Sequence, residues 1–306
     1  MSKPVALILL NWNTPTHTAN CISSIMKHCD ATQYDLIIAD NGSTDGSLAL
    51  LKAQFPEHIY IDNKENLGFA EGNNRALSYS IKHNYTYSLL LNTDTETDED
   101  FITPLVQHLE SHRNAGAVQP AIFYLHKRDL LWNGGSYFSK FFGVTYSKNQ
   151  KSRQNLKDVE KVDWITGCCF LVRNEVLKHT GLFNEQFFLY YEDVELSFRL
   201  RERGHELHYF PGTKIYHEAG VSGKQSNKNN EGTLSPIIHY YLCRNKIWFL
   251  RRYGNPIFAP VMILHNSFYY GALFSYFFLR NRRKKAQYLF KGIREGLITP
   301  KSSIWP

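Results

Sequence analysis

Short apolar runs alternate with amphipathic stretches over the first two thirds of the chain. An apolar run of about four to eight residues indicates a buried strand, and apolar positions three and four residues apart indicate a helix. The apolar runs predict strands at residues 5–10, 35–39, 58–61 and 87–91. The helical spacing predicts helices at residues 16–27, 47–54, 71–82, 98–111 and 174–178. Because strands and helices alternate, we expect an α/β fold with a mostly parallel sheet flanked by helices.

The second half of the chain is less regular. Residues 162–172 predict a strand that contains small residues, and residues 190–204 predict a helix that ends at Gly204. Two strand-like pieces follow, at residues 205–210 and 214–218. Two polar segments predict loops, at residues 147–158 and 222–233.

Three polar clusters begin where predicted strands end. They are "NWN" (11–13), "DNGSTDGS" (40–47) and "NTDT" (92–95). In a parallel sheet, ligands bind beside the carboxyl ends of the strands. We therefore predict one binding site to which all three strand ends contribute.

The third cluster lies in the segment "LLNTDTETDEDF" (90–101), which holds five carboxylates in twelve residues. A divalent cation used in phosphate chemistry takes hard oxygen ligands, commonly one or two carboxylates together with phosphate oxygens. Asp94 comes directly after the strand and is therefore our candidate metal ligand. The later acids are typical of a first helical turn, with Thr97 as the N-cap and Asp100 as the capping-box acid.

Residues 65–77 ("ENLGFAEGNNRAL") place glycines and asparagines at the start of a predicted helix. Gly68 and Gly72 permit a close approach of the backbone to a ligand. The amides of Asn66, Asn73 and Asn74 have no obvious structural duty in the sequence. The same composition is also common in an ordinary turn, so this segment alone leaves both interpretations open.

Two further polar positions stand at the ends of elements. Glu192 and Asp193 lie at the N-terminus of a predicted helix, where the helix dipole favours ionised carboxylates. An ionised carboxylate beside an acceptor hydroxyl is a general base, but an acidic helix cap explains the same pair. His217 ends a strand-like piece, where it could ligate a metal or serve a structural role.

The last part of the chain is basic and aromatic. From Arg244 onward there are twelve Lys and Arg residues and one acid, Glu295, whereas the remainder has 23 basic and 27 acidic residues. A basic surface can face nucleic acid or anionic lipid. The apolar and aromatic residues beside it favour lipid, and we expect no nucleic-acid partner.

One apolar segment, residues 257–279, contains no Asp, Glu, Lys or Arg and is long enough to cross a bilayer. Pro260, His265 and Asn266 dilute it, and basic residues on both sides give no orientation. We expect helices that lie in or dip into the membrane surface. A single transmembrane span and a core helix of the folded domain are the alternatives.

The cysteines and the first apolar run bear on the compartment. The five cysteines show neither metal-ligand spacing nor a disulfide framework, which favours reduced thiols in a cytosolic protein. The run "VALILL" (5–10) is short and lacks a basic lead-in, so it predicts a first strand and no signal peptide.

In combination, six segments resemble the inverting family 2 glycosyltransferases of the GT-A fold, and among these the bacterial rhamnosyltransferases of cell-surface polysaccharide synthesis. The segments are "LLNWN" (9–13), "IIADNGSTDGS" (37–47), "NLGFAEGNNRAL" (66–77), "LLNTDT" (90–95), the stretch from "TGCCFLV" to "RLRERG" (166–204) and "YFPGTKIYHEAGVS" (209–222). The resemblance implies a GT-A fold, with a mixed, mostly parallel Rossmann-like sheet flanked by helices. It covers the chain from residue 4 to residue 222 and leaves the aromatic, basic C-terminal helices as an addition.

The resemblance also implies roles for individual residues. Asp94 would hold a Mg²⁺ or Mn²⁺ ion on the diphosphate of the donor, and His217 would be the family's C-terminal metal ligand. Asn92 stands where the family's DxD motif has its first Asp, so we expect it on the nucleotide instead of the metal. The residues expected on the nucleotide sugar are Asn11, Asn13, Asp40, Asn66, Gly68, Asn73 and Asn92.

Asp193 matches the catalytic base of the family, with Glu192 and Trp164 near the acceptor. It would take the proton of the acceptor hydroxyl while that oxygen attacks the anomeric carbon, and this single displacement inverts the configuration. One base is enough because no covalent intermediate forms, unlike the paired carboxylates of glycoside hydrolases.

The expected organisation is a GT-A glycosyltransferase domain over residues 1–235 and a membrane-associated helical segment over residues 236–306. Within the domain, residues 1–110 would bind the nucleotide and residues 111–235 would carry the acceptor and catalytic half. The expected partners are a nucleotide-sugar donor, a glycan or polyprenyl-diphosphate-linked acceptor, and the anionic cytoplasmic face of the cell membrane.

The donor expected from the resemblance is dTDP-rhamnose, and UDP-galactose, UDP-N-acetylhexosamine and GDP-mannose are the alternatives. Two other functions remain open at this point. A nucleotidyltransferase would need a glycine-rich, basic loop after the first strand, which "NWNTPTHT" (11–18) does not provide. A non-catalytic nucleotide-sugar binder would lack the base, whereas Asp193 is present.

Overall fold

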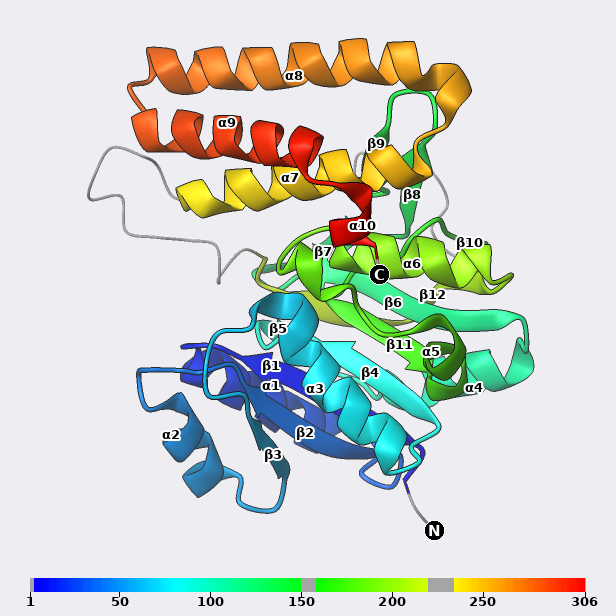
Figure 1. Ribbon diagram of the computed structural model, residues 1–306. Coiled ribbons are helices and arrows are strands. Elements are labelled where there is room, and N and C mark those ends of the chain that lie inside the picture. Colours follow the sequence, from blue (N-terminus) through cyan, green and yellow to red (C-terminus); the bar gives the residue numbers. More distant parts are fainter. Residues whose placement is uncertain (1–2, 150–157, 220–233, 306) are drawn as a thin grey trace. The chain divides into compact units, whose positions relative to one another are not determined.

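The computed structural model describes residues 3–149, 158–219 and 234–305 (Figure 1). The chain divides into two compact units. The first comprises Met1–Tyr137, Ser147–Phe183 and Asp193–Ala219, and the second comprises Phe138–Tyr146, Asn184–Glu192 and Gly220–Pro306. The second unit thus joins two short earlier segments to the C-terminal helices, and the expected domain boundary at residue 235 stays a prediction.

A mixed ten-stranded sheet forms the first unit. Its strands are β1 (Val5–Asn11), β2 (Tyr34–Asp40), β3 (Ile59–Asp62), β4 (Tyr87–Leu91), β5 (Thr95–Glu96), β6 (Ala115–Tyr124), β7 (Lys127–Asn133), β10 (Glu160–Lys161), β11 (Cys169–Arg173) and β12 (Glu206–His217). The order along the sheet is β10-β12-β6-β11-β4-β1-β2-β3, with β5 paired to β12 and β7 to β6. The strands β1 to β4 run parallel, and β11 lies antiparallel between β4 and β6. The carboxyl ends of β1, β2 and β4 therefore meet at one edge, as the sequence predicted.

Helices cover both faces of this sheet. They are α1 (Pro15–His28), α2 (Ser47–Gln54), α3 (Gly68–Lys82), α4 (Ile102–Ser111), α5 (Asn174–Thr180) and α6 (Glu192–Glu202). Strand β1 alternates between the faces, because successive side chains of a strand point to opposite sides. Val5, Leu7 and Leu9 join the core under α1 and α4, whereas Ala6 and Ile8 join the core under α3, α5 and α6. The central strand is thus buried on both sides, which explains its unbroken apolar run.

The second unit is mainly helical. Its elements are the tip of the hairpin formed by β8 (Ser136–Ser139) and β9 (Val144–Ser147), the 3-10 turns η1 (Glu185–Phe187) and η2 (Pro256–Phe258), and helices α7 (Pro236–Tyr253), α8 (Ala259–Leu279), α9 (Arg283–Ile298) and α10 (Lys301–Ile304). Glycines bring α9 close to α7. A Cβ at Gly292 would lie 2.7 Å from the Tyr240 carbonyl oxygen, and one at Gly296 would lie 2.9 Å from Ile247 Cβ. Larger side chains at these two glycines would force the helices apart.

Two sequence assignments were wrong in extent. The segment 162–172 is a strand only from Cys169, because the loop before it turns towards the start of α6. The two pieces predicted at 205–210 and 214–218 form the single strand β12, whose pairing with β6 shifts register between Phe210 and Lys214. Most of the predicted loop at 147–158, and all of that at 222–233, lies outside the described residues.

The predicted start of α4 was also wrong. We expected the helix from residue 98 with Thr97 as its N-cap, but it begins at Ile102. Thr97 instead donates its hydroxyl to the carbonyl of Glu99 at 2.7 Å. Asp100 accepts from the backbone N–H groups of Ile102 and Thr103 at 3.0 and 3.2 Å. The capping function therefore belongs to Asp100, because the residues before it are drawn into contacts with β12.

Candidate active site

The ends of β1 and β2 carry a buried polar pair. Asn11 and Asp40 are register partners, and Asn11 Nδ2 donates to Asp40 Oδ1 at 2.7 Å. Asp40 Oδ2 accepts from the backbone N–H of Ser43 at 2.9 Å. A carboxylate offers about four acceptor sites, so two donors fix its orientation and leave capacity for a ligand. The structure thus brings together two of the predicted nucleotide-binding residues.

Asn13 fastens the next loop to the same strand end. Its backbone has φ 53°, and its Oδ1 accepts from the Thr44 N–H at 2.8 Å. Its own N–H donates to Ser43 Oγ at 2.9 Å. Asparagine tolerates this left-handed conformation better than most residues do. Asn13 therefore shapes the loop after β2, whatever it contributes to a ligand.

Asn41 is a site residue that sequence reasoning missed. Its Nδ2 donates to Asn66 Oδ1 at 3.1 Å and to the Gly68 carbonyl at 3.0 Å, and its Oδ1 accepts from the Leu67 N–H at 3.2 Å. Within "DNGSTDGS" it looked like a turn residue, because its side-chain partners lie 22 to 27 positions away. Asn41 ties the predicted sugar-binding loop, which includes Asn66 and Gly68, to the end of β2.

Asn73, another predicted site residue, is engaged elsewhere. It is buried in α3, and its Nδ2 donates to the carbonyl of Phe69, one turn earlier, at 2.9 Å. Its contact with the nucleotide sugar stays a prediction. The neighbouring Gly72 packs closely instead, because a Cβ there would lie 3.0 Å from Asn41 Oδ1.

Asp94 and His217, far apart in sequence, meet where β4 and β12 end. His217 is paired with Thr95 across β5 and β12, and His217 Nε2 lies 3.1 Å from Asp94 Oδ1. Both side chains are buried, and Trp132 packs edge-on against the imidazole with ring centroids 4.5 Å apart. Burial opposes ionisation of Asp94, but the neighbouring His217 outweighs it and holds the pKa of Asp94 below its usual range.

The geometry of this pair fits two neighbouring ligands of one divalent ion. Octahedral Mg²⁺ has bonds of about 2.1 Å, so adjacent ligand atoms lie about 3.0 Å apart. Neither ring nitrogen of His217 has a well-aligned hydrogen-bond partner among the described residues. The described part of the chain holds no cluster of three or more His, Cys, Asp or Glu residues placed to bind a metal. The other ligands of such an ion would therefore be phosphate oxygens and water.

The acids after Asp94 serve the fold. Asp98 Oδ2 accepts from the Tyr216 hydroxyl at 2.9 Å. Glu99 Oε1 accepts from the Thr213 hydroxyl at 2.8 Å and from the Lys214 N–H at 3.0 Å. Both side chains fasten the start of α4 to β12, so the densest part of the acidic segment is structural.

Asp193 is held at the start of α6 by two backbone donors. Its Oδ2 accepts from the Gly167 N–H at 2.9 Å, and its Oδ1 accepts from the Val194 N–H at 2.8 Å. Burial raises the pKa of this carboxyl despite these two hydrogen bonds. A raised pKa makes the ionised carboxylate a stronger base, which suits proton abstraction near neutral pH.

The loop 166–169 connects Asp193 with the other parts of the site. Gly167 donates to Asp193, and the next residue, Cys168, accepts from the Asn92 N–H at 2.9 Å. A Cβ at Gly167 would lie 2.9 Å from Phe69 Cζ, so glycine is needed for α3 to approach. Asp193, the segment from Asn92 to Asp94 and the start of α3 thus converge on one short loop.

The two residues expected near the acceptor lie in different units. Trp164 is half-buried in the first unit, and its Nε1 donates to the Tyr137 carbonyl at 3.1 Å. Glu192 is buried and ends the segment 184–192 of the second unit. Their contact with an acceptor stays a prediction.

The residues from 7 to 181, more than half of the chain, match the family model described as "Glycosyl transferase family 2". The chain belongs to glycosyl transferase family 2. Membership of this family, predicted from the sequence motifs, is thus confirmed, and the protein is a glycosyltransferase.

Two curated relatives of this glycosyltransferase are rhamnosyltransferases by name. The N-acetylglucosaminyl-diphospho-decaprenol L-rhamnosyltransferase of Mycobacterium tuberculosis is 26% identical over 246 residues, which cover 73% of this chain and 79% of the relative. The dTDP-rhamnosyl transferase RfbF of Shigella flexneri is 20% identical over 298 residues, which cover 96% of this chain and 94% of the relative.

A solved structure supports the predicted fold. The crystal structure of GalNAc-T7 with UDP, GalNAc and Mn²⁺ superimposes with a TM-score of 0.63 at 12% identity, over 85% of this chain and 50% of that one. Together with the family match, this likeness confirms the GT-A fold of the family 2 glycosyltransferase.

Proposed function

We propose that this glycosyltransferase transfers rhamnose from dTDP-rhamnose to a polyprenyl-diphosphate-linked glycan, with inversion at the anomeric carbon, in the synthesis of a cell-surface polysaccharide. The observation that carries the proposal is the convergence of Asp193 and the segment from Asn92 to Asp94 on the loop 166–169. The names of the two curated relatives support rhamnose as the sugar, and one of those names supports a lipid-linked acceptor.

Asp193 acts as the general base. Its carboxylate removes the proton of the acceptor hydroxyl as that oxygen attacks the anomeric carbon, and the nucleoside diphosphate leaves from the opposite face. The N–H groups of Gly167 and Val194 fix the orientation of the carboxylate before the acceptor arrives. One base suffices, since a single displacement forms the new bond.

Asp94 and His217 would hold the divalent cation, Mg²⁺ or Mn²⁺. When bound there, the ion would supply positive charge that stabilises the leaving diphosphate. Support comes from the 3.1 Å separation of Asp94 Oδ1 and His217 Nε2, which suits neighbouring ligands. The solved GalNAc-T7 structure, which has the same fold, contains Mn²⁺. Asn11, Asn13, Asp40, Asn66, Gly68 and Asn92 form the nucleotide-sugar side of the site, and Asn41 holds the sugar-binding loop in place.

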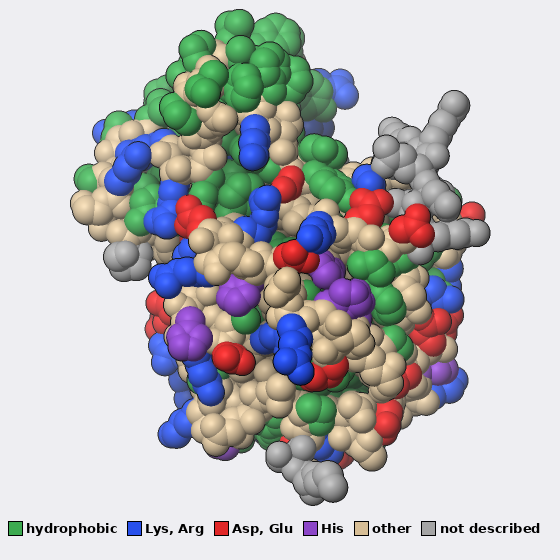
Figure 2. Space-filling model, turned by 90° about the vertical axis from the view of Figure 1, so that its right-hand side faces the viewer, with side chains coloured by type: hydrophobic (Ala, Val, Ile, Leu, Met, Phe, Trp, Pro, Cys, Tyr) green, Lys and Arg blue, Asp and Glu red, His purple; other side chains and the backbone are tan. Residues whose placement is uncertain are grey.

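The helical unit attaches the enzyme to the cytoplasmic face of the anionic membrane. Within the described residues, one helix, Pro256–Leu279, is apolar and long enough to cross a membrane by length and composition. Its side chains are unusually exposed: Leu264 is 73%, Phe268 78% and Phe278 71% exposed, and Figure 2 shows hydrophobic side chains gathered in this region. Basic residues flank the helix on both sides, which suits anionic headgroups.

Flotation with vesicles tests the attachment. The protein is expected to float with vesicles of mixed anionic and zwitterionic lipid, and a Leu264→Glu, Phe268→Glu variant to float much less. The matched control, Leu50→Glu, changes an exposed leucine of the first unit and should float like the wild type. Equal flotation of all three proteins contradicts the assignment of α8 as the membrane surface.

Product analysis tests the reaction itself. The enzyme is incubated with Mn²⁺, a lipid-linked acceptor and each nucleotide sugar in turn, and the products are resolved by mass spectrometry and NMR. The proposal predicts release of dTDP, a new rhamnosyl linkage and an anomeric configuration opposite to that of the donor. Release of a sugar 1-phosphate, which follows from attack at phosphorus, would support a nucleotidyltransferase, and donor binding without any product would support a non-catalytic binder.

A further inference from the structure

Three aromatic residues just before Asp193 have an unfavourable backbone conformation. Phe188, Tyr190 and Tyr191 have φ values of 58°, 67° and 70°, a region that L-residues with bulky side chains rarely adopt. At Phe188, where ψ is −58°, the Leu189 N–H donates to the Phe187 carbonyl at 2.6 Å, which closes a strained γ-turn. Such a segment persists only where its surroundings hold it, and strain of this kind is common at functional sites.

The amide of Asn245, on α7, holds this segment. Asn245 is fully buried, and its Nδ2 donates to the carbonyls of Phe187, Leu189 and Tyr190 at 2.8, 2.9 and 2.7 Å. Its Oδ1 accepts from Arg244 Nε at 2.8 Å, so the amide cannot flip without losing partners. One side chain thus binds three carbonyls of the four-residue stretch that contains the γ-turn.

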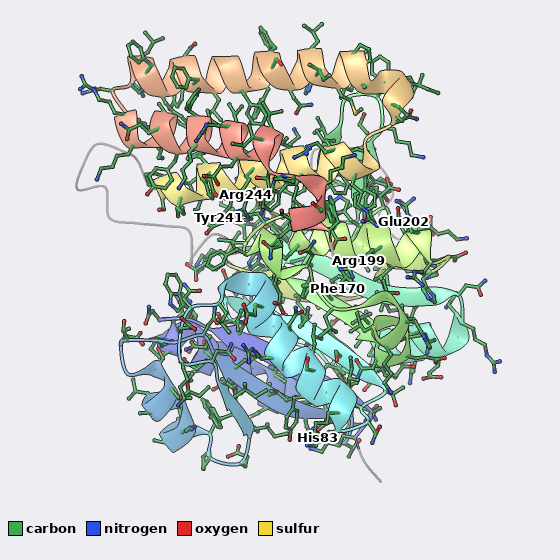
Figure 3. The ribbon with its side chains drawn as sticks, viewed as in Figure 1. His83, Phe170, Arg199, Glu202, Tyr241 and Arg244 are labelled. Atoms are coloured by element: carbon green, nitrogen blue, oxygen red, sulfur yellow. The ribbon has the colours of Figure 1, made fainter. Side chains whose placement is uncertain are left out.

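Arg244, the preceding residue on α7, binds the same segment. Its guanidinium donates to the carbonyls of Gln186 and Phe187 at 2.8 and 3.3 Å. The same group lies 4.0 Å from the ring centroid of Trp248 and 5.0 Å from that of Tyr241 (Figure 3). Stacking of this kind fixes a guanidinium that would otherwise sample many rotamers.

Aromatic contacts hold the side chains of the same turn. Phe187 is fully buried against Trp248 and Trp305, with ring centroids 5.8 and 5.5 Å apart, and Phe188 stacks on Tyr241 at 5.0 Å. The segment 184–192 and α7 belong to one compact unit, and Asp193 is the next residue in the chain.

From this arrangement we infer that Asn245 and Arg244 are positioning residues for the transfer reaction: by binding the carbonyls of residues 186–190, α7 fixes the strained turn that delivers Asp193 to the acceptor. This inference rests on the proposed role of Asp193 as the base. It gives the C-terminal helices a part in catalysis, separate from any attachment to a membrane. Both side chains are buried and bind the backbone of the turn, so their expected effect is on the placement of the base.

Steady-state kinetics of Asn245→Ala, in the full chain with a soluble acceptor analogue, test the inference. A misplacement of a reacting group by about 1 Å can lower the rate about 100-fold, so we expect kcat to fall by that order. The KM for the donor should change by less than about twofold, because the nucleotide-sugar side of the site is untouched. Hydrogen exchange of the peptide covering residues 184–193 should become faster.

The matched control is Asn266→Ala. Asn266 is also a buried amide of the helical unit, and it donates to the carbonyls of Met262 and Phe142, away from the turn. The Asn266→Ala variant should be less stable than the wild type, but its kcat and the hydrogen-exchange rate of residues 184–193 should stay unchanged. Equal kinetic losses in the two variants, or a wild-type kcat in Asn245→Ala, would overturn the inference.

A double substitution separates a specific role from general destabilisation. Glycine adopts positive φ at no steric cost, so Phe188→Gly should make the turn less dependent on Asn245. We expect the loss of kcat in the double variant to be smaller than the product of the two single losses. Should Asn245→Ala fail to fold, Arg244→Lys gives the same readouts, because it keeps the charge and removes the two-carbonyl contact.

Asp193→Asn, measured in parallel, distinguishes a failure of the proposed base from a failure of the inference about Asn245. Turnover at the wild-type rate in Asp193→Asn would refute the proposed base, and with it this inference. An inactive Asp193→Asn beside a fully active Asn245→Ala would refute the inference alone.

Discussion

Removal of the Asn41 amide should weaken both donor binding and the fold. Asn41→Ala deprives the Leu67 N–H and the Gly68 carbonyl of their partner. A buried backbone group without a partner costs about 1–3 kcal/mol, and the cost is smaller at Leu67 because this residue is partly exposed. We therefore expect the free energy of unfolding to fall by about 1–3 kcal/mol, the cost of leaving one buried group, the Gly68 carbonyl, without a partner. The loop of Asn66 and Gly68 would then be mobile before the donor binds.

The matched control is Asn74→Ala. Asn74 is also a buried amide, and it exchanges two hydrogen bonds with the backbone of Phe183, at 2.9 and 3.0 Å. Phe183 is buried, so its N–H and its carbonyl would both be left without a partner, and the free energy of unfolding should fall by about 2–6 kcal/mol. This variant should be the less stable of the two, yet it should bind the donor like the wild type.

Urea unfolding and calorimetric titration with the donor and Mn²⁺ measure the two effects separately. The dissociation constant of the donor should rise at least about tenfold in Asn41→Ala. This corresponds to about 1.4 kcal/mol of binding free energy, which is lost because binding must now order the loop. If Asn41→Ala binds the donor as tightly as Asn74→Ala does, the loop of Asn66 and Gly68 has no part in donor binding.

Two further predictions concern the charged groups of the site. Because burial raises the pKa of Asp193 and the base acts when ionised, kcat should rise with pH along a limb displaced above the range usual for aspartate; a limb in the usual range contradicts this. Asp94→Ala and His217→Ala should each weaken Mn²⁺-dependent nucleotide binding at least about tenfold by calorimetry. The control Asp98→Ala, which removes a structural acid, should keep that dependence, and equal effects of all three substitutions would refute the metal site.

Buried strands were the most predictable part of the fold. The strand β4 has the predicted bounds, because all five of its residues are buried and the run is uninterrupted. The strand β12 was predicted as two pieces because Pro211 and Gly212 look like a break. In the sheet the chain passes through these residues by a shift of register and continues along β6. A local pattern cannot distinguish a bulge inside a strand from the turn between two strands.

The start of α4 shows a similar limit. A run of acids after Thr97 matches a helix N-terminus, since each acid suits the helix dipole. Asp98 and Glu99 are instead bound to Tyr216, Thr213 and Lys214 of a strand more than a hundred residues later. Tertiary partners thus decided where the helix begins, and the sequence near residue 98 contains no sign of them.

The candidate site likewise contains some residues that the sequence predicts and others that it does not. Asp94, His217 and Asp193 were predictable because they belong to motifs that resemble a known family. Asn41 and Asn245 were not predicted, because a buried amide that binds distant carbonyls has no signature in composition or spacing. Their importance becomes visible only when the partners are adjacent in space.

Asp193→Asn tests the central claim most directly. The substitution keeps the size of the side chain and removes the base. In single-turnover assays with donor, Mn²⁺ and acceptor, we expect transfer to fall by about 10²–10⁴-fold, the usual contribution of a general base. The dissociation constant of the donor, measured on the same preparation, should stay close to that of the wild type. Transfer at the wild-type rate would contradict the assignment of Asp193 as the base of this glycosyltransferase.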